Sequence, residues 1–105
     1  MSNYQESVLK NGLRLITHTN KESKVTEIDV WIKAGGRYET NETWGYAHIL
    51  EHMLLKGTEK YPDVFAVHSK LDRAGAYANA YTGVDQVRFV FQVAGKYTDS
   101  FLELV

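Results

Sequence analysis

The sequence lacks cysteine altogether and contains a single proline among its 105 residues. Without cysteine it can form neither a disulfide framework nor a thiolate metal site, so any metal ion has to be bound by histidine and carboxylate side chains. It also lacks an apolar run of the ~20 residues that cross a bilayer. The first residues, MSNYQESVLKNG, contain neither an export signal nor an arginine-rich transit sequence. We therefore expect a cytoplasmic protein that does not enter a membrane.

An excess of charge of either sign is missing as well. Twelve basic and thirteen acidic residues leave a formal charge of −1, so no net field attracts nucleic acid or an anionic membrane. The 44% of apolar residues is typical of an ordinary globular protein. The length fits one domain or part of one, since domains usually hold ~100–150 residues.

The hydrophobic pattern predicts both strands and helices. Alternation between turn residues predicts strands over 8–9 and 13–17 around Asn11-Gly12, then over 25–33, 76–82 and 86–94. Helical spacing and capping residues predict helices over 44–56 with Thr43 as N-cap, over 64–74 before Gly75, and from Lys96 to a chain end at Val105 that falls within the helix. The expected class is α+β, a mostly antiparallel sheet with helices packed on one face.

Three polar residues interrupt the apolar helix predicted over 44–56. At 100° per residue, His48, Glu51 and His52 share an arc of about 100°. We expect the opposite, apolar arc to pack on the sheet. It comprises Tyr46, Ala47, Ile49, Leu50, Met53 and Leu54. The polar triplet therefore has a face of its own.

The spacing of this triplet suits a metal site. Side chains four apart on a helix have Cβ atoms ~5–6 Å apart, so His48 and His52 can converge on one ion. Glu51 is close enough to take a proton from water bound to such an ion, as in the inverted motif H-x-x-E-H. The alternative is a set of surface polar residues, or core histidines satisfied by hydrogen bonds. His18 and His68 have no such spacing and are expected to be solvated.

The residues around the motif resemble a known family. GYAHILEHMLLKGTEKYP, preceded by VWIKAGGRYETNETW and followed by LDRAGAYANAYTGVDQVRFVFQV, resembles the N-terminal part of the pitrilysin/insulinase family of zinc metallopeptidases, in its processing-peptidase-like branch. The resemblance implies that His48 and His52 bind zinc and that Glu51 is the catalytic base. It also implies that the strand with Asn79, Ala80 and Tyr81 runs beside the site and binds an extended peptide backbone.

Other substrate contacts have competing interpretations. Leu55 falls on the site side of the helix and is a candidate wall of a substrate side-chain pocket. Apart from the resemblance, the favoured interpretation of Asn79 is a turn or hairpin residue that binds its own backbone. Tyr77 and Tyr81 are equally explained as half-buried sheet aromatics.

The family pattern is incomplete in this sequence. The resemblance implies a third zinc ligand, a glutamate further downstream, and a second similar half of the enzyme, neither of which this sequence contains. We therefore interpret residues 1–105 as the N-terminal part of a single zinc peptidase domain. Two histidines are too few for a zinc site, so the 105 residues alone are expected to bind zinc weakly and to hydrolyse little.

Three hypotheses follow from this pattern. The first is a fragment of a zinc-dependent endopeptidase, whose substrates are peptides held in extended form. The second is a catalytically inactive, truncated homologue that acts as a partner subunit or interaction module. The third is a chain completed by a partner subunit or by another copy of itself, since the apolar end FLELV favours association.

Overall fold

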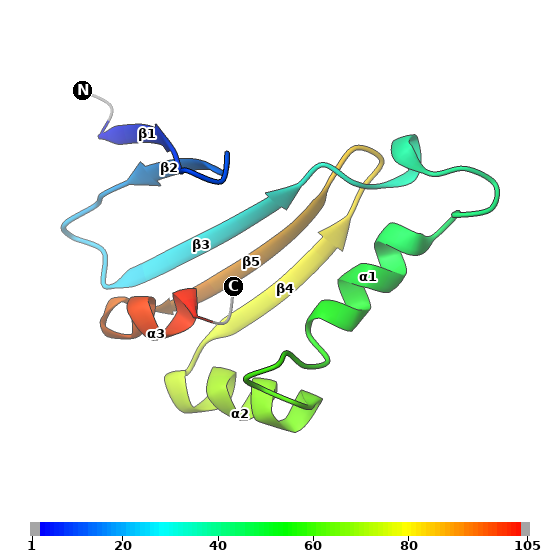
Figure 1. Ribbon diagram of the computed structural model, residues 1–105. Coiled ribbons are helices and arrows are strands. Elements are labelled where there is room, and N and C mark those ends of the chain that lie inside the picture. Colours follow the sequence, from blue (N-terminus) through cyan, green and yellow to red (C-terminus); the bar gives the residue numbers. More distant parts are fainter. Residues whose placement is uncertain (1–2, 104–105) are drawn as a thin grey trace.

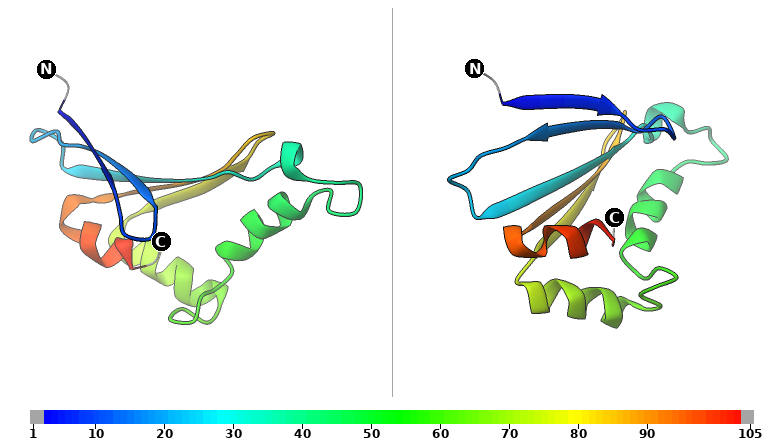
Figure 2. Two further views of the ribbon diagram at one scale, coloured as in Figure 1. Left: turned by 45° about the horizontal axis from the view of Figure 1, so that its top comes forward. Right: turned by 60° about the vertical axis from the view of Figure 1, so that its left-hand side comes forward.

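Two antiparallel sheets and three α-helices make up residues 3–103, the part of the chain that the computed structural model describes (Figure 1). The strands are β1 (Tyr4–Val8), β2 (Arg14–His18), β3 (Val25–Ile32), β4 (Tyr77–Thr82) and β5 (Val87–Ala94). The helices are α1 (Tyr46–Leu54), α2 (Val64–Ala74) and α3 (Thr98–Leu102), with short 3-10 turns at Gly36–Tyr38 and Gly95–Tyr97. The helices lie on one side of the larger sheet (Figure 2), which confirms the predicted α+β class.

The hairpin β1–β2 forms around the predicted turn. Its strands pair in antiparallel register from Tyr4 opposite His18 to Val8 opposite Arg14. Gly12 adopts a φ of 86°, and the side chain of Asn11 accepts a hydrogen bond from the Leu13 backbone N–H at 3.1 Å. Both strands are exposed along their whole length.

The larger sheet has the strand order β3-β5-β4, with all pairs antiparallel. β5 lies in the middle, and its helix-facing residues Val87, Phe89, Phe91 and Val93 are all buried. In the register of β4, Ala78 lies opposite Phe91 and Ala80 opposite Phe89, on the face that meets the helices. Among the described strands β4 pairs only with β5, so its other side is a free edge.

The hydrophobic core lies between this sheet and the helices. The buried residues of the core are Ala47 from α1, Val67 and Leu71 from α2, Val87, Phe89, Phe91 and Val93 from β5, and Phe101 from α3. Phe101 is completely inaccessible to solvent. Full burial of such side chains stabilises a fold by about 1.5–3 kcal/mol each. α2 begins after Asp63, whose carboxylate accepts a hydrogen bond from Ala66 N–H. It ends at Gly75, the predicted C-terminal glycine, which has a φ of 57°.

The predicted N-cap of α1 is wrong. Gly45, with a φ of 89°, occupies the cap position and offers no side chain. Thr43 instead accepts a hydrogen bond from Thr40 N–H at 2.8 Å. The carboxylate of Glu39 takes over the capping, since it accepts from the backbone N–H groups of Gly45 and Ala47, both at 2.8 Å. The start of α1 is therefore fixed by a residue outside the helix.

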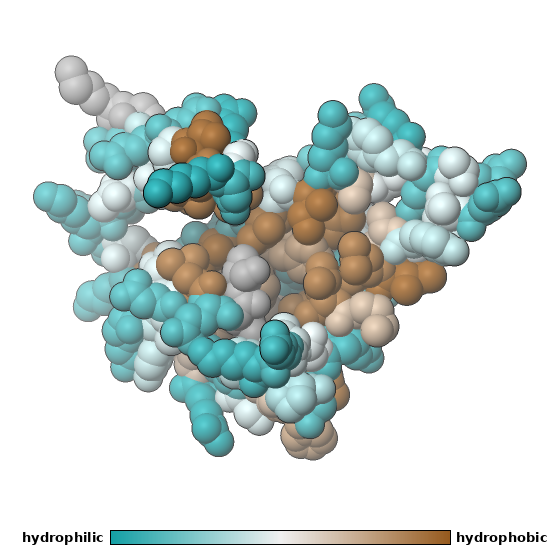
Figure 3. Space-filling model, viewed as in Figure 1, coloured by the Kyte–Doolittle hydropathy of each residue, from teal (hydrophilic) through white to brown (hydrophobic). Residues whose placement is uncertain are grey.

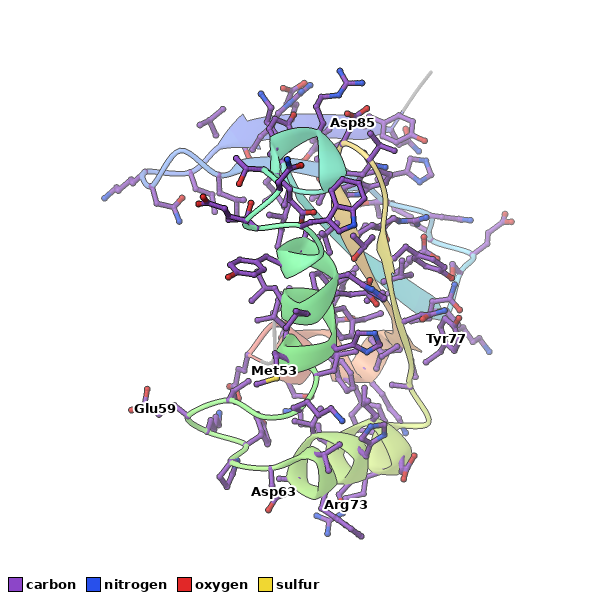
Figure 4. All side chains as sticks on the ribbon, turned by 90° about the vertical axis from the view of Figure 1, so that its right-hand side faces the viewer. Met53, Glu59, Asp63, Arg73, Tyr77 and Asp85 are labelled. Atoms are coloured by element: carbon purple, nitrogen blue, oxygen red, sulfur yellow. The ribbon has the colours of Figure 1, made fainter. Side chains whose placement is uncertain are left out.

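The predicted packing face of α1 is also wrong. Of the expected apolar arc only Ala47 is buried, whereas Ile49 and Met53 are each 59% exposed. Met53 lies on the side of α1 away from β4 (Figure 4). Apolar side chains gather near the middle of the face of the molecule that Figure 3 shows. A spacing of four places Ala47 and Glu51 of α1, and Leu55 just after it, on the side of the helix that is buried or half-buried. α1 thus turns its polar triplet toward β4.

The last helix is shorter than predicted within the described residues. A 3-10 turn over Gly95–Tyr97 precedes α3, and the predicted continuation through residues 104–105 lies outside the described part of the chain. None of the helices over residues 3–103 combines the length and the apolar character needed to span a membrane.

Candidate metal centre

The three residues of the motif meet on one side of α1. The Nε2 atoms of His48 and His52 are 3.0 Å apart, and the two ring centroids are 4.6 Å apart. One ligand atom from each of these histidines and from Glu51 lies within 4.8 Å of the others. Both histidines are exposed, whereas Glu51 is half-buried. Within residues 3–103 this is the group whose geometry suits a metal ion.

The distances fit zinc as part of a larger ligand set. Two imidazole nitrogens that bind one tetrahedral zinc at ~2.0–2.1 Å are separated by about 3.3 Å, close to the 3.0 Å found between His48 and His52. Nitrogen and carboxylate oxygen are also ligand types that zinc prefers. Structural zinc sites use four ligands and catalytic sites three plus water. The two histidines therefore offer part of a zinc ligand set, and a complete site in which Glu51 is not a ligand requires at least one more.

Glu51 is held by the neighbouring strand. The hydroxyl of Thr82 donates a hydrogen bond to Glu51 Oε2, and both residues are partly buried. Sequence reasoning did not identify Thr82 as this partner. A signal existed in the alternation of β4, because Thr82 shares the helix-facing side with Ala78 and Ala80.

Glu39 is a second site residue that sequence reasoning missed. Hydrogen bonds from the backbone N–H groups of Ala47 and then Gly45 lower the pKa of the Glu39 carboxyl below its ordinary value of 4.5. A carboxylate at the N-terminus of α1 also interacts favourably with the helix dipole. No spacing rule connects a loop residue to a helix six and eight residues further on, so the sequence offered no signal for this contact.

A cleft of about 500 Å³ opens beside the motif. It is lined by Gly36, Glu39, Trp44, Gly45, His48, Glu51, Ala80, Tyr81 and Thr82. Two of the predicted substrate-binding residues, Ala80 and Tyr81, are thus brought to the motif. Leu55 lines a separate cavity of about 270 Å³ together with core residues such as Phe89 and Phe91.

Asn79 lies on the other face of β4, between two tyrosines. Its amide nitrogen donates to the hydroxyls of Tyr77 and Tyr81, both at 2.9 Å. Its carbonyl oxygen accepts from the backbone N–H of Ala80, also at 2.9 Å. Asn79 therefore organises the strand beside the cleft and does not line it.

The two other histidines lie away from the motif. His68 is an exposed residue of α2. His18 ends β2 and stacks on Tyr4 with ring centroids 4.6 Å apart. Neither joins the group that could hold a metal ion.

Comparison with known proteins gives consistent matches. The family model described as Insulinase (Peptidase family M16) matches residues 14–105. The chain is 37% identical over 99 residues, 94% of its length, to the probable mitochondrial-processing peptidase subunit beta of Arabidopsis thaliana, of which it covers 18%. It is 34% identical over 101 residues, 96% of its length, to cytochrome b-c1 complex subunit 1 of Mus musculus, of which it covers 21%. A protease from Helicobacter pylori has a crystal structure that matches with a TM-score of 0.91 and 31% identity, over 98% of this chain and 25% of that one.

These names correct one prediction from the sequence. The expected cytoplasmic location is wrong, because relatives from Arabidopsis thaliana, Lentinula edodes and Dictyostelium discoideum are named as mitochondrial-processing peptidase subunits. That expectation depended only on the signals missing from the first residues.

The match covers the elements that form the site. Residues 14–105 include α1 with His48, Glu51 and His52, and β4 with Thr82. The chain spans about a fifth of the length of the curated relatives it matches. The resemblance noted in the sequence is confirmed, and the chain belongs to the insulinase family of peptidases, peptidase family M16.

Proposed function

We propose that this chain is the N-terminal part of a zinc-dependent metallopeptidase that cleaves peptide bonds within extended peptides. One observation carries the proposal: two imidazoles and a carboxylate converge within 4.8 Å of one another beside the free edge of β4. Membership of a peptidase family supports the class of reaction.

His48 and His52 hold zinc in this proposal, through the Nε2 atoms that lie 3.0 Å apart. Zinc bound there lowers the pKa of water to about 7. Glu51 acts as general base when it accepts a proton from the attacking water. It acts as general acid when it returns that proton to the nitrogen of the departing amine. The C–N bond breaks, water supplies the new C–O bond, and the carboxylate is regenerated.

The substrate lies along β4 in this proposal. Its free edge can pair with an extended backbone, as sheet edges do in other peptide-binding proteins. The Ala80 N–H is held by the side chain of Asn79, a contact that a peptide carbonyl can replace. Tyr81 lies in the lining of the cleft, where it can contact a substrate side chain. Leu55 has no part in this proposal, because its cavity shares no lining residue with the cleft.

The remaining ligand comes from outside the described residues in this proposal. Two histidines leave zinc short of the three protein ligands that catalytic sites use. The source is either a later part of the same protein, a partner subunit or a second copy. The names of two relatives, a subunit beta and a subunit 1 of larger assemblies, support a partner subunit. The 105 residues alone are then expected to bind zinc weakly.

Two substitutions in the full-length protein test the roles of the motif. Glu51→Gln keeps the zinc ligands but removes the base, so we expect an unchanged zinc content and about a 10²- to 10⁴-fold loss of kcat. His52→Ala removes a ligand and is expected to lose both zinc and activity. His68→Ala, at an exposed position on α2, is the matched control and should change neither. Peptide cleavage by Glu51→Gln at the normal rate would contradict the role of this carboxylate.

A second candidate function is an inactive partner subunit. It is favoured by the relative named as a subunit of the cytochrome b-c1 complex, whose name describes no peptidase. The two functions differ in the unmodified full-length protein. A protein that contains one zinc per chain and still cleaves no peptide, alone or with its partner, would support the second function.

A further inference from the structure

The contact between Thr82 and Glu51 has a role beyond packing. Resting on the proposed function, we infer that Thr82 is a positioning residue that orients the Glu51 carboxylate for proton transfer. The two residues are 31 positions apart, and the hydroxyl of Thr82 donates to Glu51 Oε2. No other described residue donates a hydrogen bond to this carboxylate.

Thr82 lies in a rigid part of the sheet, so it can restrain the side chain of Glu51. It is the last residue of β4 and pairs in register with Val87, which is only 2% exposed. The turn that follows is closed by a hydrogen bond from Gly83 N–H to the Gln86 carbonyl at 2.8 Å. Because threonine is branched at Cβ, its χ1 angle has few accessible rotamers. The hydroxyl is therefore fixed to the sheet rather than to a mobile loop.

The Glu51 carboxylate needs such a partner because its own side-chain torsions do not fix its orientation. The last torsion of a glutamate side chain has a broad distribution, so the plane of the carboxylate is not set by the helix. A donor on Oε2 fixes that plane and leaves Oε1 available to accept a proton. General bases act only when held within hydrogen-bond reach of the proton they abstract. The strand thus sets the orientation of a base that the helix carries.

Thr82→Val and Thr82→Ser in the full-length protein separate this role from a structural one. Valine has nearly the shape of threonine but no hydroxyl, whereas serine keeps the hydroxyl and loses a methyl group. We expect Thr82→Val to lower kcat by about 10- to 100-fold, as the loss of one hydrogen bond to a charged group does. KM and zinc content should not change, because the bond serves the transition state. Thr82→Ser should retain most of the activity.

Three outcomes would overturn the inference. Thr82→Val could retain full kcat, Thr82→Ser could be as impaired as Thr82→Val, or Thr82→Val could lose zinc together with activity. If Thr82→Val does not fold, Thr82→Ala compared with Thr82→Ser gives the same test. Glu51→Gln in the same assay distinguishes a failure of the proposed function, since that function fails when Glu51→Gln is active or when the unmodified protein is inactive.

Discussion

Gly35 is the position where a single methyl group should cost most. It follows β3 in a conformation with a φ of 128° and a ψ of −177°, a region that is essentially restricted to glycine. A Cβ atom at this position would lie 2.8 Å from the carbonyl oxygen of Val84 and still closer to that of Gly83. Both oxygens belong to the turn between β4 and β5. Gly35→Ala must therefore strain the backbone and push this turn away.

The magnitude follows from two terms. Backbone strain of this kind costs about 1–3 kcal/mol, and forcing an extra methyl group into a packed site costs about 1–3 kcal/mol more. We expect Gly35→Ala to lower the free energy of unfolding by about 2–6 kcal/mol, a large part of the 5–15 kcal/mol typical of domains. The displaced turn begins one residue after Thr82, so the same change should disturb the partner of Glu51.

Urea unfolding followed by the fluorescence of Trp31 and Trp44 measures this effect. At a slope of about 1.5 kcal/mol per molar urea, the midpoint should fall by about 1.3–4 M. Gly75→Ala is the matched control, because Gly75 has a φ of 57° but open space around its Cβ position. Gly75→Ala should therefore cost only the backbone strain of a left-handed conformation, about 1–2 kcal/mol. Equal shifts of the two midpoints would refute the steric part of the reasoning.

Two further predictions concern stability. Hydrogen bonds to Ala47 and Gly45 lower the pKa of Glu39 in the folded state, so the stabilisation by this carboxylate is complete above its ordinary value of 4.5 and is lost as the pH falls below it. The difference in melting temperature between the unmodified chain and Glu39→Gln should shrink on acidification, and a constant difference would contradict this. Phe101→Ala should lower the free energy of unfolding by about 3–5 kcal/mol, whereas Leu102→Ala, at an exposed position, should cost less than about 0.5 kcal/mol in the same denaturation experiment.

Local rules predicted much of this fold from the sequence. The Asn11-Gly12 turn, the strand alternation of β3 and the glycine that ends α2 all depend on residues close in the chain. The sequence likewise placed His48, Glu51 and His52 on one face of one helix, which the structure confirms. Each of these features is set by backbone preferences over a few residues.

Contacts over longer distances could not be predicted in this way. Glu39 caps α1 because the loop before the helix folds back on it, and Thr82 meets Glu51 because β4 and α1 lie side by side. The alternation of β4 places Thr82 on the helix-facing side, but which residue of α1 it meets, like the cap by Glu39, depends on tertiary structure. Thr43 has a hydroxyl that suits an N-cap, but it does not cap α1 because this hydroxyl accepts a hydrogen bond from Thr40 N–H.

The orientation of α1 against the sheet combines apolar contacts with one hydrogen bond to Glu51. A helical wheel shows which residues share a face, but it does not show which face meets the sheet. Here the helix rests on Ala47, Glu51 and Leu55, which places a half-buried carboxylate against β4. Such a carboxylate is costly unless it accepts hydrogen bonds, and the Thr82 hydroxyl provides one. Ala47 and Leu55 pack against the core beside this hydrogen bond, whereas the rest of the predicted apolar arc stays exposed within residues 3–103.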